Sequence, residues 1–519
     1  MDERIAAALA RLPLYTAEHV TLSAAALALG LLLSLPLSIF AYRRASLRWP
    51  LLTVVSVVQT IPSLALLALF YPLLLGLSSL AEHAFGRGFS ALGFLPALLA
   101  LTLYSMLPVV RNTVVGLASV DPALVEAARG VGMTDRQRLW QVELPLAAPT
   151  ILAGVRTSAV WVIGTATLST PIGQTSLGNF IFTGLQTENW IFVLVGCVAG
   201  AVLALVTDQL LGLIEIGLAR RERPRIVVGA AGLLLGIAVA VVPMTGRNAP
   251  EYVVGAKTFP EQFILSRLLV DQLQENGLSA SQLSGLGSTV ILRALANNEL
   301  DVYVDYSGTI WANAMGRRDN PGRVAVTREV TRWLAQTHGI VVLGELGFEN
   351  AYALAMRRER AKELGVASIA DLRMHAPTLV IGGDYEFFGR PEWSSIRQAY
   401  GVAFSRERQY QSTFMYRALA DGDVDVVSAF SSDGRIASYD LKVLDDPAGA
   451  IPPYDALLLA APSRAHDDRL RAALSPVVGK ISIDLMRKAN QRVEDAGAGG
   501  TPRTAARWLR SQFVAPATD

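Results

Sequence analysis

The fold is decided by the stretch Asp121-Pro-Ala-Leu-Val-Glu-Ala-Ala-Arg-Gly-Val-Gly-Met133 and its continuation Trp140-Gln-Val-Glu-Leu-Pro145. Asp121 can cap a helix whose first position is a proline, an arrangement typical of helix starts. Gly130 and Gly132 then end that helix, and a second amphipathic segment follows as far as the proline at 145. The stretch therefore predicts two short helices at an angle, rimmed with arginine, which form a knob suited to docking into a groove of another protein.

The sequence around this knob is strongly apolar. The chain has 519 residues, of which 52% are hydrophobic and only 17% are charged. Runs of about 20 apolar residues are long enough to cross the ~30 Å hydrocarbon core of a membrane as helices. We expect six such spans: Val20–Ala41, Pro50–Leu75, Ala91–Val110, Pro149–Leu168, Trp190–Thr207 and Ile226–Val242.

The arginines between the spans predict their orientation. Three connections are basic, and cytoplasmic loops carry an excess of Lys and Arg. All three connections lie in the cytoplasm only if the N-terminus is outside, so the sixth span should carry everything after it to the outside. The deciding residues are Arg43, Arg44 and Arg48, then Arg111, Arg129, Arg136 and Arg138, and finally Arg220, Arg221, Arg223 and Arg225.

Three charged residues in or near the spans call for a separate interpretation. Arg156 lies early in the fourth span, and Asp208 and Glu215 follow the fifth. Long basic side chains near the end of a span reach the membrane surface. We therefore expect Arg156 to reach the cytoplasmic interface, and the two acids to mark the same interface.

The knob resembles the coupling loop of ABC importer permeases, with Val142 in place of the usual Ile. Three flanking motifs, 59–67, 104–113 and 156–168, are similar to permeases of osmoprotectant uptake systems. This resemblance implies docking on a separate ATPase subunit and a homodimer of permease chains. The coupling residues that it implies are Glu126, Ala127, Ala128, Gly132, Leu144 and Pro145.

ATP binding is not expected in this chain. The sequence contains no Gly-x-x-x-x-Gly-Lys-Ser/Thr phosphate loop, whose backbone would cradle the phosphates of a nucleotide. We expect the partner ATPase to bind ATP and Mg²⁺, and no cofactor in this chain. The single cysteine, Cys197, allows no intrachain disulfide and no zinc site built from cysteine pairs.

Residues after 250 mix charged, apolar and turn residues as a globular domain does. We expect strands at 252–255, 301–304, 379–382 and 424–429, and helices at 258–275, 291–297 and 415–420. Thr258 and Glu261 have the spacing of a capping box at a helix start. Alternating strands and helices predict α/β lobes, with ligands at the carboxyl ends of strands.

Aromatic and polar residues collect in the connections of this domain. The clusters are 305–309, 350–352, 384–390, 430–433 and 452–454. Several aromatic rings around one cleft would bind a quaternary ammonium group by cation–π contact, since its nitrogen cannot donate a hydrogen bond. A carboxylate on the same solute would need donors, for which Gln262, Thr309 and Arg390 are candidates.

The same domain resembles osmoprotectant-binding proteins along motifs at 255–262, 305–309, 350–356, 388–391 and 431–435. The resemblance implies an α/β two-lobed domain of the periplasmic-binding-protein type. It also implies cage tyrosines at Tyr306, Tyr352 and Tyr454, with polar contacts from Gln262 and Thr309. Phe430 stands where such proteins usually have Tyr, so it keeps the ring face and loses the hydroxyl. The predicted ligand residues are Gln262, Tyr306, Thr309, Tyr352, Arg390, Phe430 and Tyr454.

Together these patterns predict four parts and a transport function. The parts are an N-terminal extracytoplasmic segment (1–18), a helical transmembrane permease domain (19–218) with a cytoplasmic coupling loop (119–148), a sixth span with a linker (219–250), and an extracytoplasmic substrate-binding domain (251–519). We expect a multi-pass protein of the cell (inner) membrane, surrounded by lipid, that imports glycine betaine, choline, carnitine or a similar solute.

Other functions remain open at this point. Ergothioneine also carries a trimethylammonium group and is a rival solute. A ligand-gated receptor or channel with a clamshell sensor domain is the alternative from another class. A tethered enzyme is less favoured, because His338, His375 and His466 are scattered and form no pair with a nucleophile. The net charge of +2 gives no indication of nucleic-acid binding, and none is expected.

Overall fold

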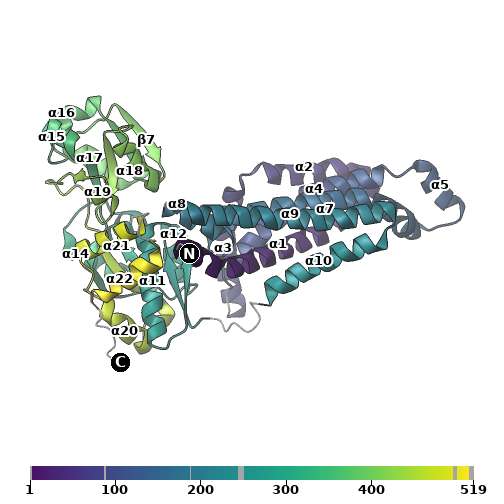
Figure 1. The fold of residues 1–519 in the computed structure, drawn as a ribbon, viewed down its shortest axis with the longest axis horizontal. Helices are drawn as coiled ribbons and strands as arrows, with labels where there is room; N and C mark the ends of the chain where they lie inside the picture. Colours follow the sequence, from purple (N-terminus) through teal and green to yellow (C-terminus); the bar gives the residue numbers. More distant parts are fainter. Residues whose placement is uncertain (1–2, 87–88, 188, 243–249, 495–499, 514–519) are drawn as a thin grey trace. The chain divides into compact units, whose positions relative to one another are not determined.

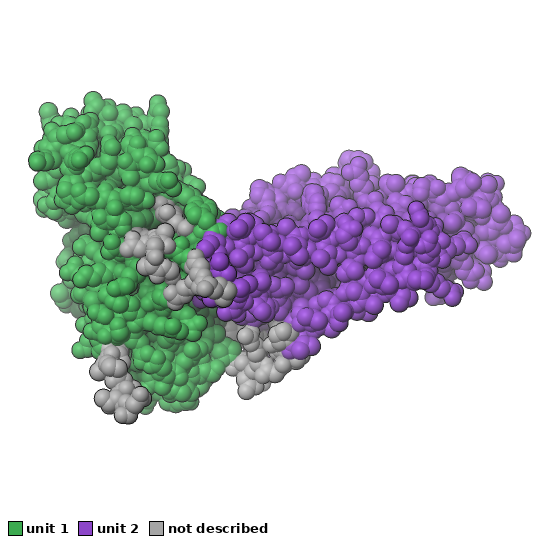
Figure 2. Space-filling view, viewed as in Figure 1, with its two compact units in different colours: residues 1–4, 183–190, 249–519 green, residues 5–182, 191–248 purple. Residues whose placement is uncertain are grey.

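The chain folds into two compact units. The structure is a computed structural model, and it describes all residues except 1–2, 87–88, 188, 243–249, 495–499 and 514–519. One unit contains residues 5–182 and 191–248, and the other contains residues 249–519 together with 1–4 and 183–190 (Figure 2). The linker predicted around residues 245–251 lies mostly outside the described residues.

The first unit is helical throughout (Figure 1). Six of its helical stretches are long and apolar enough to cross a membrane, in agreement with the predicted number. Its helices are α1 (Glu3–Arg43), α2 (Ala45–Thr60), α3 (Ser63–Phe85), α4 (Phe94–Ala118), α5 (Pro122–Gly130), α6 (Asp135–Arg138), α7 (Leu144–Ala166), α8 (Gly178–Gln186), α9 (Trp190–Arg220) and α10 (Arg223–Val241).

The predicted second span differs most from the structure. It is divided between α2 and α3, and the break lies at Ile61 and Pro62. Ile61 is extended, with φ −71° and ψ 127°, because the ring of a proline disfavours the helical conformation of the residue before it. Of these two helices, only α3 has the length and apolar composition of a span.

The N-terminal segment predicted at 1–18 is not separate, because its described residues form the first turns of α1. This helix has 41 residues and is therefore about 60 Å long, twice the thickness of the hydrocarbon core. Its N-terminal part packs inside the unit, where Ala8 is buried with Leu177, Phe180 and Phe192.

The predicted knob between α4 and α7 is confirmed as two short helices. Asp121 caps α5 by accepting a hydrogen bond from the Ala123 amide at 2.8 Å, and Thr134 and Gln137 form a capping box at α6. The second helix does not stop at Pro145, however. It runs through one π-helical turn into α7, because proline is tolerated in the first turn of a helix.

The second unit is an α/β domain with two lobes. The sheet of the first lobe has the order β2-β1-β3-β10-β4, and that of the second lobe β7-β6-β8-β5-β9. The strands are β1 (Tyr252–Ala256), β2 (Ala280–Ser284), β3 (Val302–Tyr306), β4 (Val341–Glu349), β5 (Tyr352–Arg357), β6 (Val380–Asp384), β7 (Arg406–Tyr410), β8 (Val426–Phe430), β9 (Leu441–Val443) and β10 (Asp455–Ala460).

Helices cover these sheets and close the core. They are α11 (Pro260–Glu275), α12 (Ser288–Ala296), α13 (Ser307–Thr309), α14 (Arg323–His338), α15 (Arg358–Leu364), α16 (Leu372–His375), α17 (Pro391–Tyr400), α18 (Ser412–Ala420), α19 (Arg435–Ser438), α20 (Asp468–Leu474), α21 (Ile483–Glu494) and α22 (Pro502–Ser511). The chain passes from the first lobe to the second between β4 and β5, and returns between β9 and β10. The second lobe is therefore an insertion within the first.

Candidate functional site

The four predicted cage residues lie at corresponding edges of the two sheets. Tyr306 is the last residue of β3 and Phe430 the last of β8, whereas the sequence placed both in the connections directly after these strands. Tyr352 instead begins β5, and Tyr454 directly precedes β10. They reach the same edges because β5 runs antiparallel to β8 and β10 antiparallel to β3, which pairs Tyr352 with Phe430.

Tyr352 is the centre of an aromatic group, the Tyr352 cluster. Its ring centroid lies 4.9 Å from that of Phe430, 5.3 Å from that of Phe387 and 6.1 Å from that of Tyr454. Aromatic rings attract one another at such distances. The structure thus brings three of the predicted rings together and adds Phe387, which sequence reasoning placed in the neighbouring connection without assigning it to the site.

A cation already lies on the Tyr352 ring. The guanidinium carbon of Arg390 is 4.9 Å from the ring centroid. Its nitrogens pair with Glu386 at 3.1 Å and with Glu392 at 3.2 Å, and one contacts the Tyr454 hydroxyl at 3.4 Å. Arg390 is therefore held by two carboxylates, so its predicted role toward a solute carboxylate stays a prediction.

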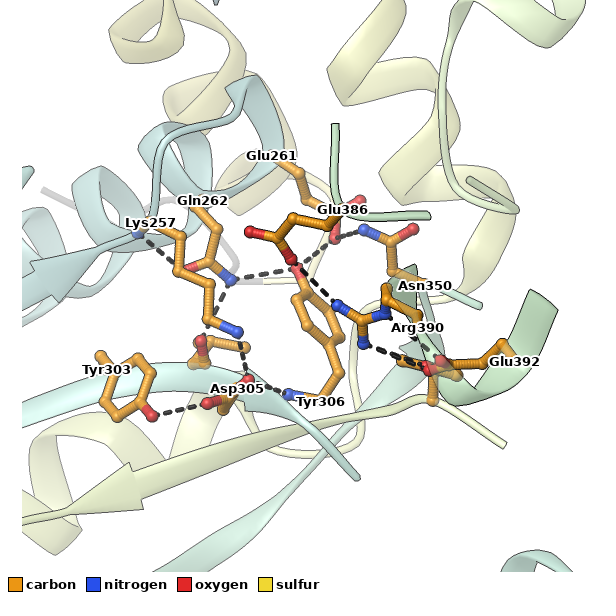
Figure 3. A network of polar contacts seen from close by, with 12 residues as sticks. Lys257, Glu261, Gln262, Tyr303, Asp305, Tyr306, Asn350, Glu386, Arg390 and Glu392 are labelled. Atoms are coloured by element: carbon orange, nitrogen blue, oxygen red, sulfur yellow. Dashed lines mark hydrogen bonds and ion pairs between the residues drawn. The ribbon is translucent and has the colours of Figure 1, made fainter. Parts of the chain in front are cut away.

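Tyr306 belongs to a second group, the Tyr306 network (Figure 3). Its hydroxyl donates to Glu261 at 2.5 Å and accepts from the Gln262 amide at 3.0 Å. Its ring stacks on Phe259 with centroids 6.2 Å apart, and the Lys257 ammonium lies 5.5 Å from its centre. Both predicted residues of this group, Tyr306 and Gln262, are thus fixed in place by hydrogen bonds.

Glu261 does not form the predicted capping box. The helix α11 starts at Pro260, with Phe259 at its cap position and no side-chain cap. The Glu261 carboxylate instead accepts from Tyr306, from Asn350 at 3.1 Å and from Asn490 at 3.0 Å. Burial raises the pKa of this carboxyl group above its usual value, while the hydrogen bonds it accepts act in the opposite direction. Tertiary contacts here override a local sequence pattern.

Asn490 links this network to the other lobe. It lies on α21 of the first lobe, and its amide also donates to the Ser432 carbonyl of the second lobe at 2.8 Å. Arg487, one turn earlier on α21, donates to the Ser431 carbonyl at 2.9 Å. Sequence reasoning missed this contribution, since Asn490 is 184 positions from Tyr306 and α21 carries no recognisable motif.

Thr309 lies apart from both groups. It is half-buried and lines an open hollow of about 890 Å³ on the first lobe, together with Asp305, Asn313 and His338. The hollow is connected to the Tyr352 cluster through Asn313, whose side-chain oxygen can accept from both terminal nitrogens of Arg390 at 3.2 Å. Thr309 therefore neighbours the predicted cage without being part of the rings.

The coupling residues occupy the exposed knob of the first unit. Glu126 and Ala127 are exposed on α5, Ala128 is buried against the base of the knob, and Gly132 has a φ of +83°, which glycine adopts without strain. Leu144 and Pro145 begin α7. A buried ion pair between Arg138 and Glu143 at 2.8 Å braces the second short helix. Apolar side chains are exposed around these residues: Leu124, Val131 and Trp140.

Two protein families match the chain. Residues 26–220 match the inner membrane component of binding-protein-dependent transport systems. Residues 250–511 match the substrate binding domain of the ABC-type glycine betaine transport system.

Individual proteins give the same division. The ergothioneine transport permease/ergothioneine binding protein of Helicobacter pylori (strain G27) is 28% identical over 88% of this chain and 83% of its own length. The choline transport system permease protein of Bacillus subtilis (strain 168) is 40% identical over 38% of this chain and 85% of its own length. A crystal structure of a glycine betaine/carnitine/choline ABC transporter covers 50% of this chain and 98% of that chain, with 27% identity and a TM-score of 0.45.

The two family matches agree with the two units, a helical one with six candidate spans among the described residues and an α/β one with two lobes. The relatives are named as transport proteins, not enzymes. The chain therefore belongs to the ABC importers that depend on a binding protein, as a transmembrane permease fused to a substrate-binding domain of the glycine betaine transport type.

Proposed function

We propose that this chain imports a solute with a quaternary ammonium group, such as glycine betaine, choline or carnitine, and that the Tyr352 cluster binds this group. The observation that carries the proposal is the cation on the face of Tyr352 inside a group of four aromatic rings. The ring face of Tyr352 already holds a delocalised cation of the protein itself, which supports the same kind of contact with a trimethylammonium group.

The chemistry of the cluster supports this class of solute. A trimethylammonium group cannot donate a hydrogen bond from nitrogen, so ring faces and negative charge are its available partners. Phe387 and Phe430 supply faces without hydroxyls, and the nearby carboxylates Glu386 and Glu392 supply negative charge. The Phe387 and Phe430 rings offer no acceptor to the N–H donors of an unmethylated amine, so such an amine should bind more weakly.

Ergothioneine is the second candidate solute. The Helicobacter pylori relative, which is named for ergothioneine, shares both halves of the fusion with this chain. Phe430 does not distinguish the two solutes. Compared with the usual Tyr, it keeps the ring face that contacts a trimethylammonium group, which both solutes carry, and lacks only the hydroxyl. The imidazole-thione ring would need more room beyond the cage than the short chain of choline does, and the open hollow beside Thr309 provides room of that kind.

Calorimetry on the purified full chain tests the proposal. The titrants are glycine betaine, choline, carnitine and ergothioneine, with glycine and ethanolamine as matched compounds without methyl groups. We expect binding of at least one methylated solute and none of its unmethylated counterpart. Tyr352→Ala should abolish the binding, whereas Tyr385→Ala, at an exposed tyrosine nearby (67% accessible), should not. Binding of no methylated solute would contradict the proposal.

Energy for import comes, in this proposal, from a separate ATPase chain that binds ATP and Mg²⁺. The docking surface is the knob of α5 and α6, where exposed Leu124, Val131 and Trp140 surround Glu126. Exposed apolar groups at a rigid element are typical of protein interfaces. One chain offers one such knob, so two copies of this chain and two ATPase subunits would form the transporter.

The proposed orientation follows the arginines. With the knob in the cytoplasm, α10 leads outward across the cell (inner) membrane, and the substrate-binding domain lies on the outer side. A ligand-gated receptor or channel would use a similar sensor domain but would need no ATPase. Purification of the chain without any ATPase partner, from cells that express the whole transport system, would favour that alternative.

A further inference from the structure

Three charged side chains bind one another between two helical stretches that are long and apolar enough to cross a membrane. Arg156 on α7 makes two parallel hydrogen bonds to Asp208 on α9, Nε to Oδ1 at 2.5 Å and Nη2 to Oδ2 at 2.7 Å. Its third nitrogen, Nη1, donates to Glu215 at 3.3 Å. The three residues therefore form one ion-paired group, and their position at the cytoplasmic interface stays a prediction.

The surface of α9 is shaped to receive the arginine. Asp208, Gly212 and Glu215 have spacings of four and three residues and so lie on one helix face. A Cβ atom at Gly212 would lie 3.4 Å from the guanidinium carbon of Arg156, so the guanidinium lies flat across the glycine. Asp208 is 12 residues before the end of α9 at Arg220, which places this group about 18 Å along the helix from that end.

The group is not charge-balanced. One arginine meets two carboxylates, which leaves one negative charge over. The side chains are also incompletely covered, with 35% of Arg156, 24% of Asp208 and 26% of Glu215 exposed. They line an open hollow of about 680 Å³ together with Thr157 and Trp161.

Trp161 gives the hollow an aromatic wall. Its side chain is 51% exposed, one helical turn beyond Thr157 on the same face of α7. Indole is the best of the natural rings for cation–π contact. An aromatic ring and an unbalanced negative charge thus meet in one hollow, which is the same pair of features that the Tyr352 cluster offers in the other unit.

A purely structural role would not require this arrangement. One carboxylate is enough to neutralise Arg156 and to hold α7 against α9, and Asp208 already makes the two parallel bonds. A second carboxylate leaves the group with a net negative charge, which a bound cation would compensate. Ionisable residues within membrane spans are rare and typically mark the path of a transported species.

We propose that the hollow between α7 and α9 is a second cation-binding site, which receives the quaternary ammonium end of the solute as it passes through the permease. Glu215 supplies the uncompensated charge, and Trp161 supplies the ring face. Arg156 and Asp208 form the fixed part of the wall. This inference rests on the proposed function, since it takes the solute to be a quaternary ammonium compound.

The test uses the full chain with its ATPase in proteoliposomes, and a methylated solute that the parent chain imports. Glu215→Gln removes the extra charge and leaves the Arg156–Asp208 pair intact. We expect uptake to fall about tenfold, with solute affinity of the same preparation within about twofold of the parent. Glu215→Asp should restore part of the uptake. The matched control is Glu222→Gln, at an acid that pairs with Arg225 in the connection after α9, and it should import normally.

A second pair of variants tests the ring. Trp161→Ala should lower uptake, and Trp161→Phe should import better than Trp161→Ala because it keeps a ring face. Retained ATPase association shows in each case that the permease is folded. The inference is overturned if Glu215→Gln imports at the parental rate, or if Trp161→Phe is no better than Trp161→Ala. A parent chain that neither binds nor imports any methylated amine would instead contradict the proposed function.

Discussion

Gly308 offers a sharp test of the predicted cage. It lies in α13, two residues after Tyr306, and its Cα faces the Tyr454 ring closely. A Cβ atom at this position would lie 2.5 Å from two carbons of that ring, whereas ordinary contacts begin at 3.4 Å. Gly308→Ala therefore forces the Tyr454 ring to move by about 0.9 Å.

The expected cost follows from what Tyr454 contacts. Its hydroxyl bonds to Glu392 and lies 3.4 Å from Arg390, and its ring contacts that of Tyr352. A displacement of this size disturbs all three contacts. Overpacking in a filled core costs about 1–3 kcal/mol, so a loss of about 2 kcal/mol in binding free energy, or roughly 30-fold in Kd, is expected.

The assay is calorimetric titration of the purified full chain with the solute that the parent binds best. Gly389→Ala is the matched control, since it lies one residue before Arg390 and a Cβ atom there meets nothing within 4 Å. We expect the control to bind within about twofold of the parent. Equal affinities for Gly308→Ala and Gly389→Ala would refute the reasoning, because they would show that the position of Tyr454 does not matter for binding.

Three further predictions concern other parts of the chain. Burial raises the pKa of Glu261, so its ionisation destabilises the fold as pH rises above about 4.5; thermal unfolding should show a smaller loss of stability over this range in Glu261→Gln than in the parent. Glu126→Arg should reduce ATPase co-purification and uptake at least tenfold while solute affinity is unchanged, and normal co-purification would contradict the docking role of the knob. In a Cys197→Ser background, Ala403→Cys should react with a membrane-impermeant maleimide in intact cells and Glu126→Cys should not; the reverse pattern would invert the proposed orientation.

The permease half was largely predictable because its determinants are local. The caps and glycines of the knob fix two short helices within 25 residues, and the structure has the predicted cap at Asp121. Span number follows from apolar length alone. The break at Pro62 was also a local signal, but the continuous apolar composition on both sides of it concealed two helices.

The candidate site was predictable only in part, since its members come together through long-range pairing. Tyr306 and Phe430 were predicted directly after their strands, and they are the last residues of these strands instead. Tyr352 and Tyr454 lie at the starts of their strands, because β5 and β10 run antiparallel to β8 and β3. Each of these strands follows a change of lobe, and the residue pattern of a strand does not reveal its direction in the sheet. The spacing of Thr258 and Glu261 predicted a local capping box. The Glu261 carboxylate instead accepts hydrogen bonds from three side chains that are distant in the sequence.

The insertion of one lobe into the other has a consequence for how the chain is made. The sheet of the first lobe contains β3 and β10, whose paired residues include Val302 and Ala460, so it cannot be completed until about 150 further residues have left the ribosome. The second lobe is continuous from β5 to β9 and can fold earlier. Pairings between such distant segments form slowly. We therefore expect the half of the domain that holds Gln262 and Tyr306 to be the last to mature, and truncations near the C-terminus to damage it before they affect the second lobe.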